Sequence, residues 1–171
     1  MNDNVHLCDD FCEATRNCDI YAMANYLRNG FELDSYDSFG KPPLHYGVLS
    51  ETTSAGGNLE VVKFLIANGT SIDICDANCT TALHLAARVQ NVSILKLLLA
   101  KGANVKAVCR SGCLPIDFAD LKSNHWIVSF NLFREIILLL HNHAVNISIP
   151  SERVPSVLHK VIKKSVKNMY L

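Results

Sequence analysis

The segment of residues 80–107 constrains the fold of this chain more than any other stretch. It begins with the apolar run 82–87 directly after Thr81, a residue type that caps helix N-termini. A polar stretch separates this run from residues 94–99, whose i, i+1, i+4, i+5 apolar spacing predicts a second helix with one broad buried face. Gly102 follows where a left-handed residue would end that helix. The segment therefore predicts a helix–turn–helix unit that cannot bury its apolar face alone.

The same unit recurs along the chain with a period of about 33 residues. Leu44-His45 repeats Leu83-His84, and residues 58–69 repeat the second helix. A weaker copy is visible in residues 19–34, and another begins where Ile116 takes the position of Leu83. Several copies in register, with both helices and both turns, indicate stacked units that bury one another's apolar faces.

These residues resemble the ankyrin repeat, whose pattern begins Asp-x-x-Gly-x-Thr-Pro-Leu-His-x-Ala-Ala. Residues 37–45 read Asp-Ser-Phe-Gly-Lys-Pro-Pro-Leu-His, and residues 76–84 read Asp-Ala-Asn-Cys-Thr-Thr-Ala-Leu-His. The resemblance implies an all-α ankyrin-repeat solenoid of helix–turn–helix units with projecting β-turn loops. We expect one domain over residues 1–171, with about four repeats and a C-terminal capping helix. The expected boundaries are units at about 8–34, 37–73, 76–107 and 109–147, and a capping segment at 150–171.

The repeats depart from the family pattern at several positions. Pro42 replaces the family's threonine, so the hydroxyl cap of that helix is lost, and Asp117 replaces the histidine of the last unit. Residues 50–55 and 122–131 are surplus to the repeat and predict longer turns between helices. The sequence is compatible with inserts that bind a partner and with inserts that fold back onto the last helices.

The amino-acid composition argues against several classes of function and partner. Sixteen basic residues balance sixteen acidic ones, so bulk charge does not favour a nucleic-acid partner. No apolar run approaches the roughly 18–20 residues that span a bilayer, and the N-terminus lacks the features of a signal peptide. We therefore expect a cytoplasmic, or also nuclear, monomer in its own cell or in a host cell, with no membrane partner. In such a compartment the seven cysteines would be thiols.

No residue pattern indicates an enzyme or a cofactor site. The chain has no phosphate-binding glycine loop, no Gly-x-Ser-x-Gly and no His-Glu-x-x-His. His45 and His84 occupy the position that the resemblance makes structural, where the imidazole joins neighbouring turns, and Thr81 occupies the capping position. We expect a protein that is not an enzyme and needs no cofactor.

The cysteines provide the alternative function. Cys75-x-x-x-Cys79 and Cys109-x-x-x-Cys113 fall on the turns of consecutive repeats, which stacking would bring side by side. Four thiolates there would make a zinc site or a redox-responsive module. The pairs are offset by one position within the repeat, and a free cysteine is also an ordinary small core residue, so the sequence favours cysteines that bind no metal.

The resemblance implies protein binding through a concave face of turn tips and first helices. The partner-binding residues predicted from the repeat pattern and from the aromatic insert are Phe39, Lys41, Tyr46, Asn78, Thr80, Arg88, Arg110, Ser111 and Trp126. The expected function is that of a stoichiometric inhibitor or adaptor. Among such proteins we favour the IκB-like inhibitors of viral type, which implies a Rel/NF-κB-type factor or another signalling protein as the partner.

Overall fold

The computed structural model describes residues 3–49, 57–119 and 139 of the chain, and every structural statement below concerns those residues. In this part the chain forms helices and connecting turns without an extended strand. The elements, in chain order, are α1 (Asp3–Arg16), α2 (Ile20–Arg28), α3 (Pro43–Leu49), α4 (Gly57–Ala67), α5 (Ala82–Arg88), α6 (Val92–Ala100) and the 3-10 helix η1 (Pro115–Phe118).

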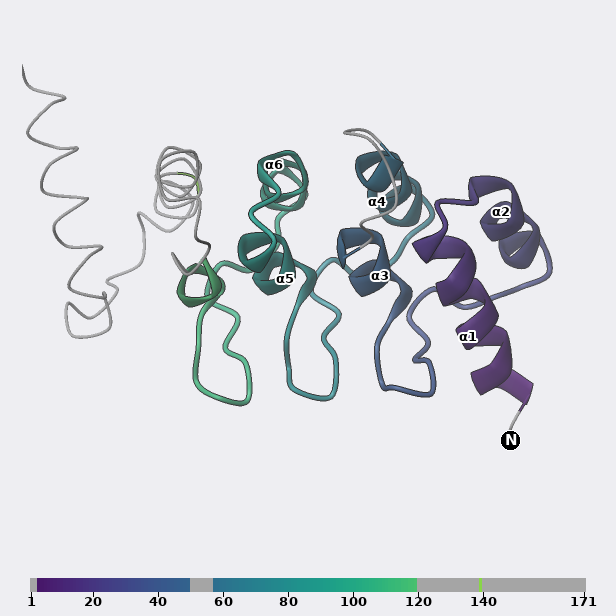
Figure 1. The fold of residues 1–171 in the computed structure, drawn as a ribbon, viewed down its shortest axis with the longest axis horizontal. Coiled ribbons are helices and arrows are strands. Elements are labelled where there is room, and N and C mark those ends of the chain that lie inside the picture. The colour runs from purple at the N-terminus through teal and green to yellow at the C-terminus, as the bar shows by residue number, and fades with distance from the viewer. Residues whose placement is uncertain (1–2, 50–56, 120–138, 140–171) are drawn as a thin grey trace, which may run out of the picture.

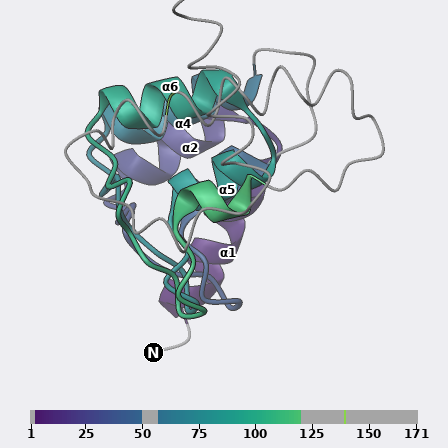
Figure 2. The same cartoon turned by 90° about the vertical axis from the view of Figure 1, so that its left-hand side faces the viewer.

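The helices stack in two rows, as Figure 1 shows. The inner row runs α1, α3, α5, η1, and each member contacts the next, while α2, α4 and α6 form the outer row. Loops between successive units project together from the inner side (Figure 2). The predicted all-α solenoid of helix–turn–helix units is confirmed.

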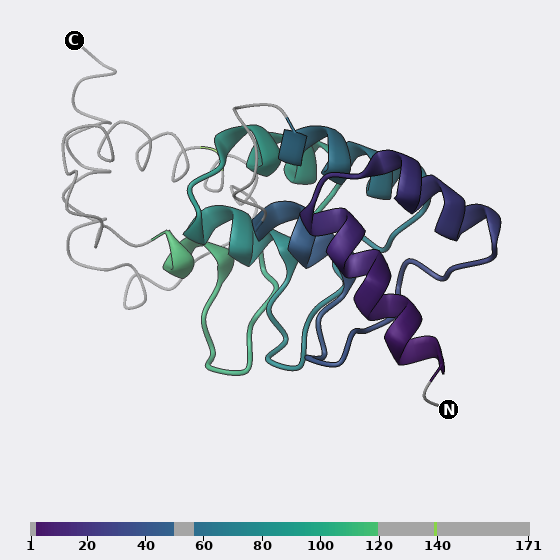
Figure 3. The same ribbon diagram turned by 45° about the vertical axis from the view of Figure 1, so that its right-hand side comes forward.

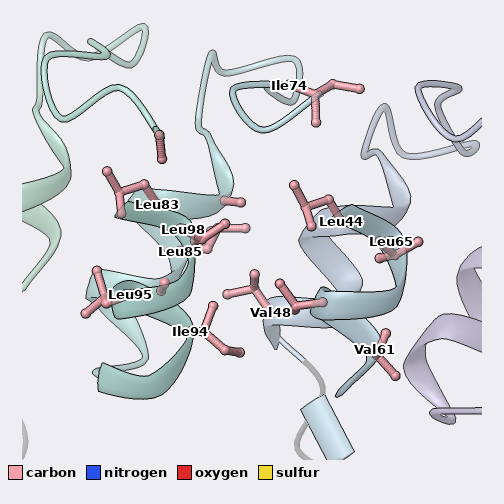
Figure 4. Packing of buried hydrophobic residues seen from close by; sticks show 14 of the residues in the cluster. Leu44, Val48, Val61, Leu65, Ile74, Leu83, Leu85, Ile94, Leu95 and Leu98 are labelled. Carbon is pink, nitrogen blue, oxygen red and sulfur yellow. The ribbon is translucent and has the colours of Figure 1, made fainter. Parts of the chain in front are cut away.

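The core lies between the two rows and continues from one unit to the next. Leu44, Leu65, Leu83 and Leu98 are each 0% exposed, and Figure 4 shows them with the branched side chains of neighbouring helices. The short inner helices α3 and α5 are buried along nearly their whole length, because they contact units on both sides. Burial between units therefore stabilises helices that are too short to be stable alone.

Helix α1 is longer than the other inner helices and starts at Asp3, earlier than the expected boundary near residue 8. Its N-terminal half runs beside the first projecting loop (Figure 3). There Asp9 accepts the backbone N–H of Ser38 at 2.8 Å. Further along α1, the ring of Phe11 stacks on that of Phe31 with centroids 4.2 Å apart. The extra turns of α1 thus support the first loop, which has no preceding loop beside it.

Several predictions fall outside the described residues. They concern the inserts at 50–55 and 122–131, Trp126, the second helix of the last unit and the capping segment 150–171. Within the described part, no helix is long and apolar enough to cross a membrane.

Candidate functional site

The first two projecting loops each contain the same pattern of hydrogen bonds, from backbone N–H groups to an aspartate side chain. A carboxylate oxygen of Asp76 accepts the N–H groups of Asn78 at 2.8 Å and Thr80 at 2.9 Å. An oxygen of Asp37 accepts those of Phe39 at 2.9 Å and Lys41 at 2.8 Å in the same way. Because each carboxylate satisfies the backbone of its own turn, the side chains at the tips are not needed to hold the turns together.

In the third loop, Cys109 occupies the position that an aspartate occupies in the first two loops. Its backbone keeps the same turn, with Cys109 N–H donating to the Cys113 carbonyl at 2.9 Å and Gly112 N–H to the Cys109 carbonyl at 2.8 Å. In addition, the N–H of Arg110 donates to the carbonyl of Asn78 at 2.7 Å. This bond joins the tip of the third loop directly to the tip of the second, so the two form one edge.

Two histidines join the inner helices α3 and α5 to the loop of the next unit. Nε2 of His45 donates to the Thr80 carbonyl at 2.7 Å, and Nε2 of His84 donates to the Cys113 carbonyl at 3.2 Å. Both rings are 0% exposed. His84 is oriented by Thr81, whose N–H donates to Nδ1 at 3.2 Å and whose hydroxyl lies 2.9 Å from the same nitrogen. This hydroxyl–imidazole pair is buried, so a substrate cannot reach it.

His45 lacks the support that His84 receives. Its buried Nδ1 has no hydrogen-bond partner among the described residues. Pro42 stands in the place of Thr81 and has neither an N–H nor a hydroxyl. Burial lowers the pKa of both His45 and His84, although the carbonyl bond of each ring opposes this shift. Each imidazole is therefore held neutral and acts as a structural donor.

Five of the predicted partner-binding residues lie on the accessible surface. Phe39 is 75% exposed at the tip of the first loop, and Arg88 is exposed at the end of α5. Asn78 and the neighbours Arg110 and Ser111 are exposed at the tips of the next two loops. These loops lie in a row along one edge of the stack (Figures 1 and 2).

The other predicted partner-binding residues are less accessible. Tyr46 and Thr80 are each only 7% exposed, so their proposed role as surface contacts needs correction. The hydroxyl of Tyr46 donates to Asp37, and the guanidinium of Arg16 lies 4.6 Å from the centre of its ring. Burial and the Asp37 carboxylate raise the pKa of Tyr46. Lys41 is half-buried, with its ammonium 5.9 Å from the same ring.

The structure does not bring the four turn cysteines together. Cys109 is buried and occupies the position equivalent to Asp76, whereas Cys113 lies at the position of Thr80. Across residues 3–49 and 57–119, no three His, Cys, Asp or Glu side chains lie close enough to share a metal ion. The four-thiolate zinc site is therefore not formed, because the two pairs are one position out of register.

Aspartates at the outer ends of the units were not singled out from the sequence. Asp34 accepts the Thr70 hydroxyl at 3.0 Å and the Ser71 N–H at 2.9 Å, and Asp73 accepts the Asn104 N–H at 2.8 Å. The sequence feature that could have identified them is their recurrence, because each lies three residues before the aspartate of the next turn, Asp37 or Asp76. These bonds fix the relative position of successive units.

Comparison with known proteins identifies the family. The model of ankyrin repeats, in three copies, matches residues 11–108 and 49–132. The chain belongs to the ankyrin-repeat family. This family consists of protein–protein interaction modules, so the described turns and inner helices form the kind of surface that its members present to proteins.

Individual ankyrin-repeat relatives differ greatly in length. Zebrafish (Danio rerio) inversin is 41% identical over 71 residues, which are 42% of this chain and 6% of inversin. Potassium channel AKT1 of Arabidopsis thaliana is 33% identical over 100 residues, 58% of this chain and 11% of the channel. Mouse (Mus musculus) protein phosphatase 1 regulatory subunit 27 is 32% identical over 111 residues, 64% of this chain and 68% of that subunit. The first two matches thus cover only a small part of much longer proteins.

Proposed function

We propose that this ankyrin-repeat chain binds a protein partner stoichiometrically, as an inhibitor or adaptor, through the edge formed by its loop tips. We call this surface the turn edge and define it by Phe39, Asn78, Arg110 and Ser111; Arg88, exposed at the end of α5, is a further candidate contact. The observation that carries the proposal is the exposure of Phe39, which leaves 75% of a large apolar side chain in water on a loop already held by Asp37. An exposed aromatic residue on a rigid backbone is suited to anchor a partner.

The chemistry of the turn edge suggests the complementary surface. Phe39 would enter an apolar pocket, while the guanidinium groups of Arg88 and Arg110 would pair with carboxylates of the partner. The 2.7 Å bond from the Arg110 N–H to the Asn78 carbonyl fixes the backbone of the two loop tips, so little backbone freedom would be lost on binding.

A finer assignment is an IκB-like inhibitor that holds a Rel/NF-κB-type factor in the cytoplasm or nucleus. Its support is the resemblance of this chain to small ankyrin inhibitors with irregular inserts. A phosphatase catalytic subunit is the second candidate partner, favoured by the match over 68% of protein phosphatase 1 regulatory subunit 27. In both cases the chain would act by occupying a surface of its partner.

Calorimetric titration of the purified chain with each candidate partner tests these assignments. We expect one partner to bind with a stoichiometry of one to one. The combined variant Phe39→Ala, Asn78→Ala and Arg110→Ala should abolish that binding while the helical circular dichroism stays unchanged. Loss of helical signal in the variant would contradict the view that these tip side chains are structurally dispensable.

Tyr21→Ala is the matched control, because Tyr21 is an aromatic residue with 74% exposure on α2, in the outer row. Its removal should leave binding intact. If the triple variant still binds while Trp126→Ala does not, the insert at 122–131 is the binding surface and the turn-edge proposal is wrong.

A further inference from the structure

The second loop carries a pair of thiols that the protein-binding role does not use. Cys75 pairs with Thr81 in an antiparallel bridge, and the N–H of Asp76 donates to the Thr80 carbonyl at 3.0 Å. The N–H of Cys79 then closes the turn on the Asp76 carbonyl at 2.8 Å. Cys75 and Cys79 therefore stand at the two sides of one tight turn, where burial and then the neighbouring Cys79 thiol raise the pKa of Cys75.

The placement of Cys79 has no packing explanation. Its side chain is exposed, and its backbone is left-handed with φ of 57°, the conformation that Gly40 and Gly112 adopt in the neighbouring loops. A residue with a β-carbon is disfavoured by about 1 kcal/mol or more in that region. A cysteine at this position thus neither fills the core nor suits the backbone, which distinguishes it from the buried cysteines.

The other closely spaced cysteines differ in a way that provides internal controls. Cys8 and Cys12 lie 3.9 Å apart at sulfur on α1, but they are 0% and 2% exposed. Cys109 is buried at the aspartate position of its turn, and the thiol of Cys113 donates to the Ser111 carbonyl at 3.9 Å. Among the described cysteines, only the pair in the second loop flanks one tight turn with an exposed thiol.

We propose that Cys75 and Cys79 form a redox-sensitive dithiol that a small-molecule disulfide, such as oxidised glutathione, converts to an intramolecular disulfide. The exposed Cys79 thiolate attacks one sulfur of the oxidant, whose S–S bond breaks and releases one glutathione thiolate. The Cys75 thiolate then attacks Sγ of Cys79 and releases the second glutathione. Overall, two protein thiols lose two electrons and two protons, and one glutathione disulfide becomes two glutathione thiols.

The resulting cross-link would lie within the proposed binding surface. Asn78 is between the two cysteines along the chain, and its carbonyl accepts the Arg110 N–H. A change in partner affinity on oxidation therefore rests on the proposed function, whereas formation of the disulfide does not. The chemical test below needs no partner, so failure of one proposal is distinguishable from failure of the other.

The dithiol is tested by oxidising the reduced full-length chain with a glutathione redox buffer, trapping remaining thiols with iodoacetamide and mapping tryptic peptides. Cleavage after Lys63 and Arg88 leaves residues 64–88 as one peptide, which contains Cys75 and Cys79 and no other cysteine. We expect this peptide to lose two hydrogen masses and both alkylation sites. Cys109 and Cys113 fall on different peptides, because Arg110 lies between them, and we expect these peptides to remain unlinked.

Two variants identify the order of the steps. Cys75→Ser should leave one glutathione on Cys79, because the resolving thiol is gone, whereas Cys79→Ser should leave peptide 64–88 without a disulfide. Cys109→Ser should change neither result.

The folded turn, rather than the spacing alone, is tested by repeating the oxidation in urea, where the internal disulfide should form more slowly. The proposal is wrong if the native peptide keeps both thiols free or accumulates a stable glutathione adduct. It is equally wrong if the unfolded chain closes the disulfide as fast as the folded one.

Discussion

The backbone N–H of Thr81 donates to Nδ1 of His84 at 3.2 Å, and the proline at the equivalent position, Pro42, cannot make this bond to His45. Consequently both ring nitrogens of His84 are hydrogen-bonded, whereas His45 is hydrogen-bonded through Nε2 alone. An unpaired buried polar atom costs about 1–3 kcal/mol, so this difference should be measurable.

Replacing Pro42 by threonine should stabilise the protein. The new N–H and hydroxyl would satisfy Nδ1 of His45 and cap α3, which together should raise the unfolding free energy by about 1 kcal/mol after the lost rigidity of proline is subtracted. Pro42→Ala supplies the N–H but no hydroxyl and should gain less. Urea unfolding followed by circular dichroism measures both, and a Pro42→Thr protein no more stable than the parent would refute the interpretation.

Glycine at residue 79 should also stabilise the chain. Cys79 is left-handed with φ of 57°, and its exposed side chain contributes little packing, so Cys79→Gly should raise the unfolding free energy by about 1 kcal/mol. The reciprocal control is Gly112→Ala, where φ is 79° and a β-carbon would meet nothing within 4 Å. That variant should lose a similar amount in the same thermal or urea measurement. Changes of the same sign in both variants would contradict the backbone explanation.

Stability should fall as the solution is acidified below the ordinary histidine pKa of 6.5. Burial lowers the pKa of His45 and His84 in the folded state, so between their folded values and 6.5 the unfolded chain binds more protons. The contribution of these rings is complete above pH 6.5 and is lost as the pH falls toward the folded values. Asp34, whose hydrogen bonds to Ser71 and Thr70 outweigh burial and lower its pKa, affects stability only in a more acidic range near and below 3.8.

Unfolding free energies between pH 7.5 and 5 measure this slope. His84→Gln removes one of the two buried rings and should reduce the slope, even though it lowers stability overall. An unchanged slope in that variant would show that His84 is not responsible.

Leu98 should be among the most costly residues to truncate. It is 0% exposed in α6, within a core that continues to the units on either side, so Leu98→Ala should cost about 2–5 kcal/mol. Val108→Ala is the control, since Val108 is an aliphatic residue with 50% exposure near the third loop, and it should cost well under 1 kcal/mol. Similar losses for the two variants would place Leu98 outside the core.

Much of the fold was predictable because it is encoded locally. The apolar spacing of residues 94–99 and the recurrence of Leu44-His45 and Leu83-His84 depend only on positions within one unit, so the helix pairs and their stacking followed from the sequence. The loss of a cap at Pro42 was likewise readable, because a missing N–H is a property of the residue itself.

Contacts between units were decided by the tertiary structure. The repeat pattern placed Tyr46 and Thr80 on the surface, but stacking buries Tyr46 against Asp37 and Arg16 and buries Thr80 behind the histidine of the preceding unit. Which side chains a neighbour covers depends on the register and direction of packing, and the pattern of one unit does not contain this information.

The cysteines show the same division. Their identical Cys-x-x-x-Cys spacing offered one joint site as the alternative, and the one-position offset within the repeat weighed against it; in the structure Cys109 is buried and Cys79 is exposed. The sequence by itself determined the repeated helix pairs, because their periodicity is local. Only the folded backbone decided which thiol is exposed, because successive residues of a tight turn point in different directions.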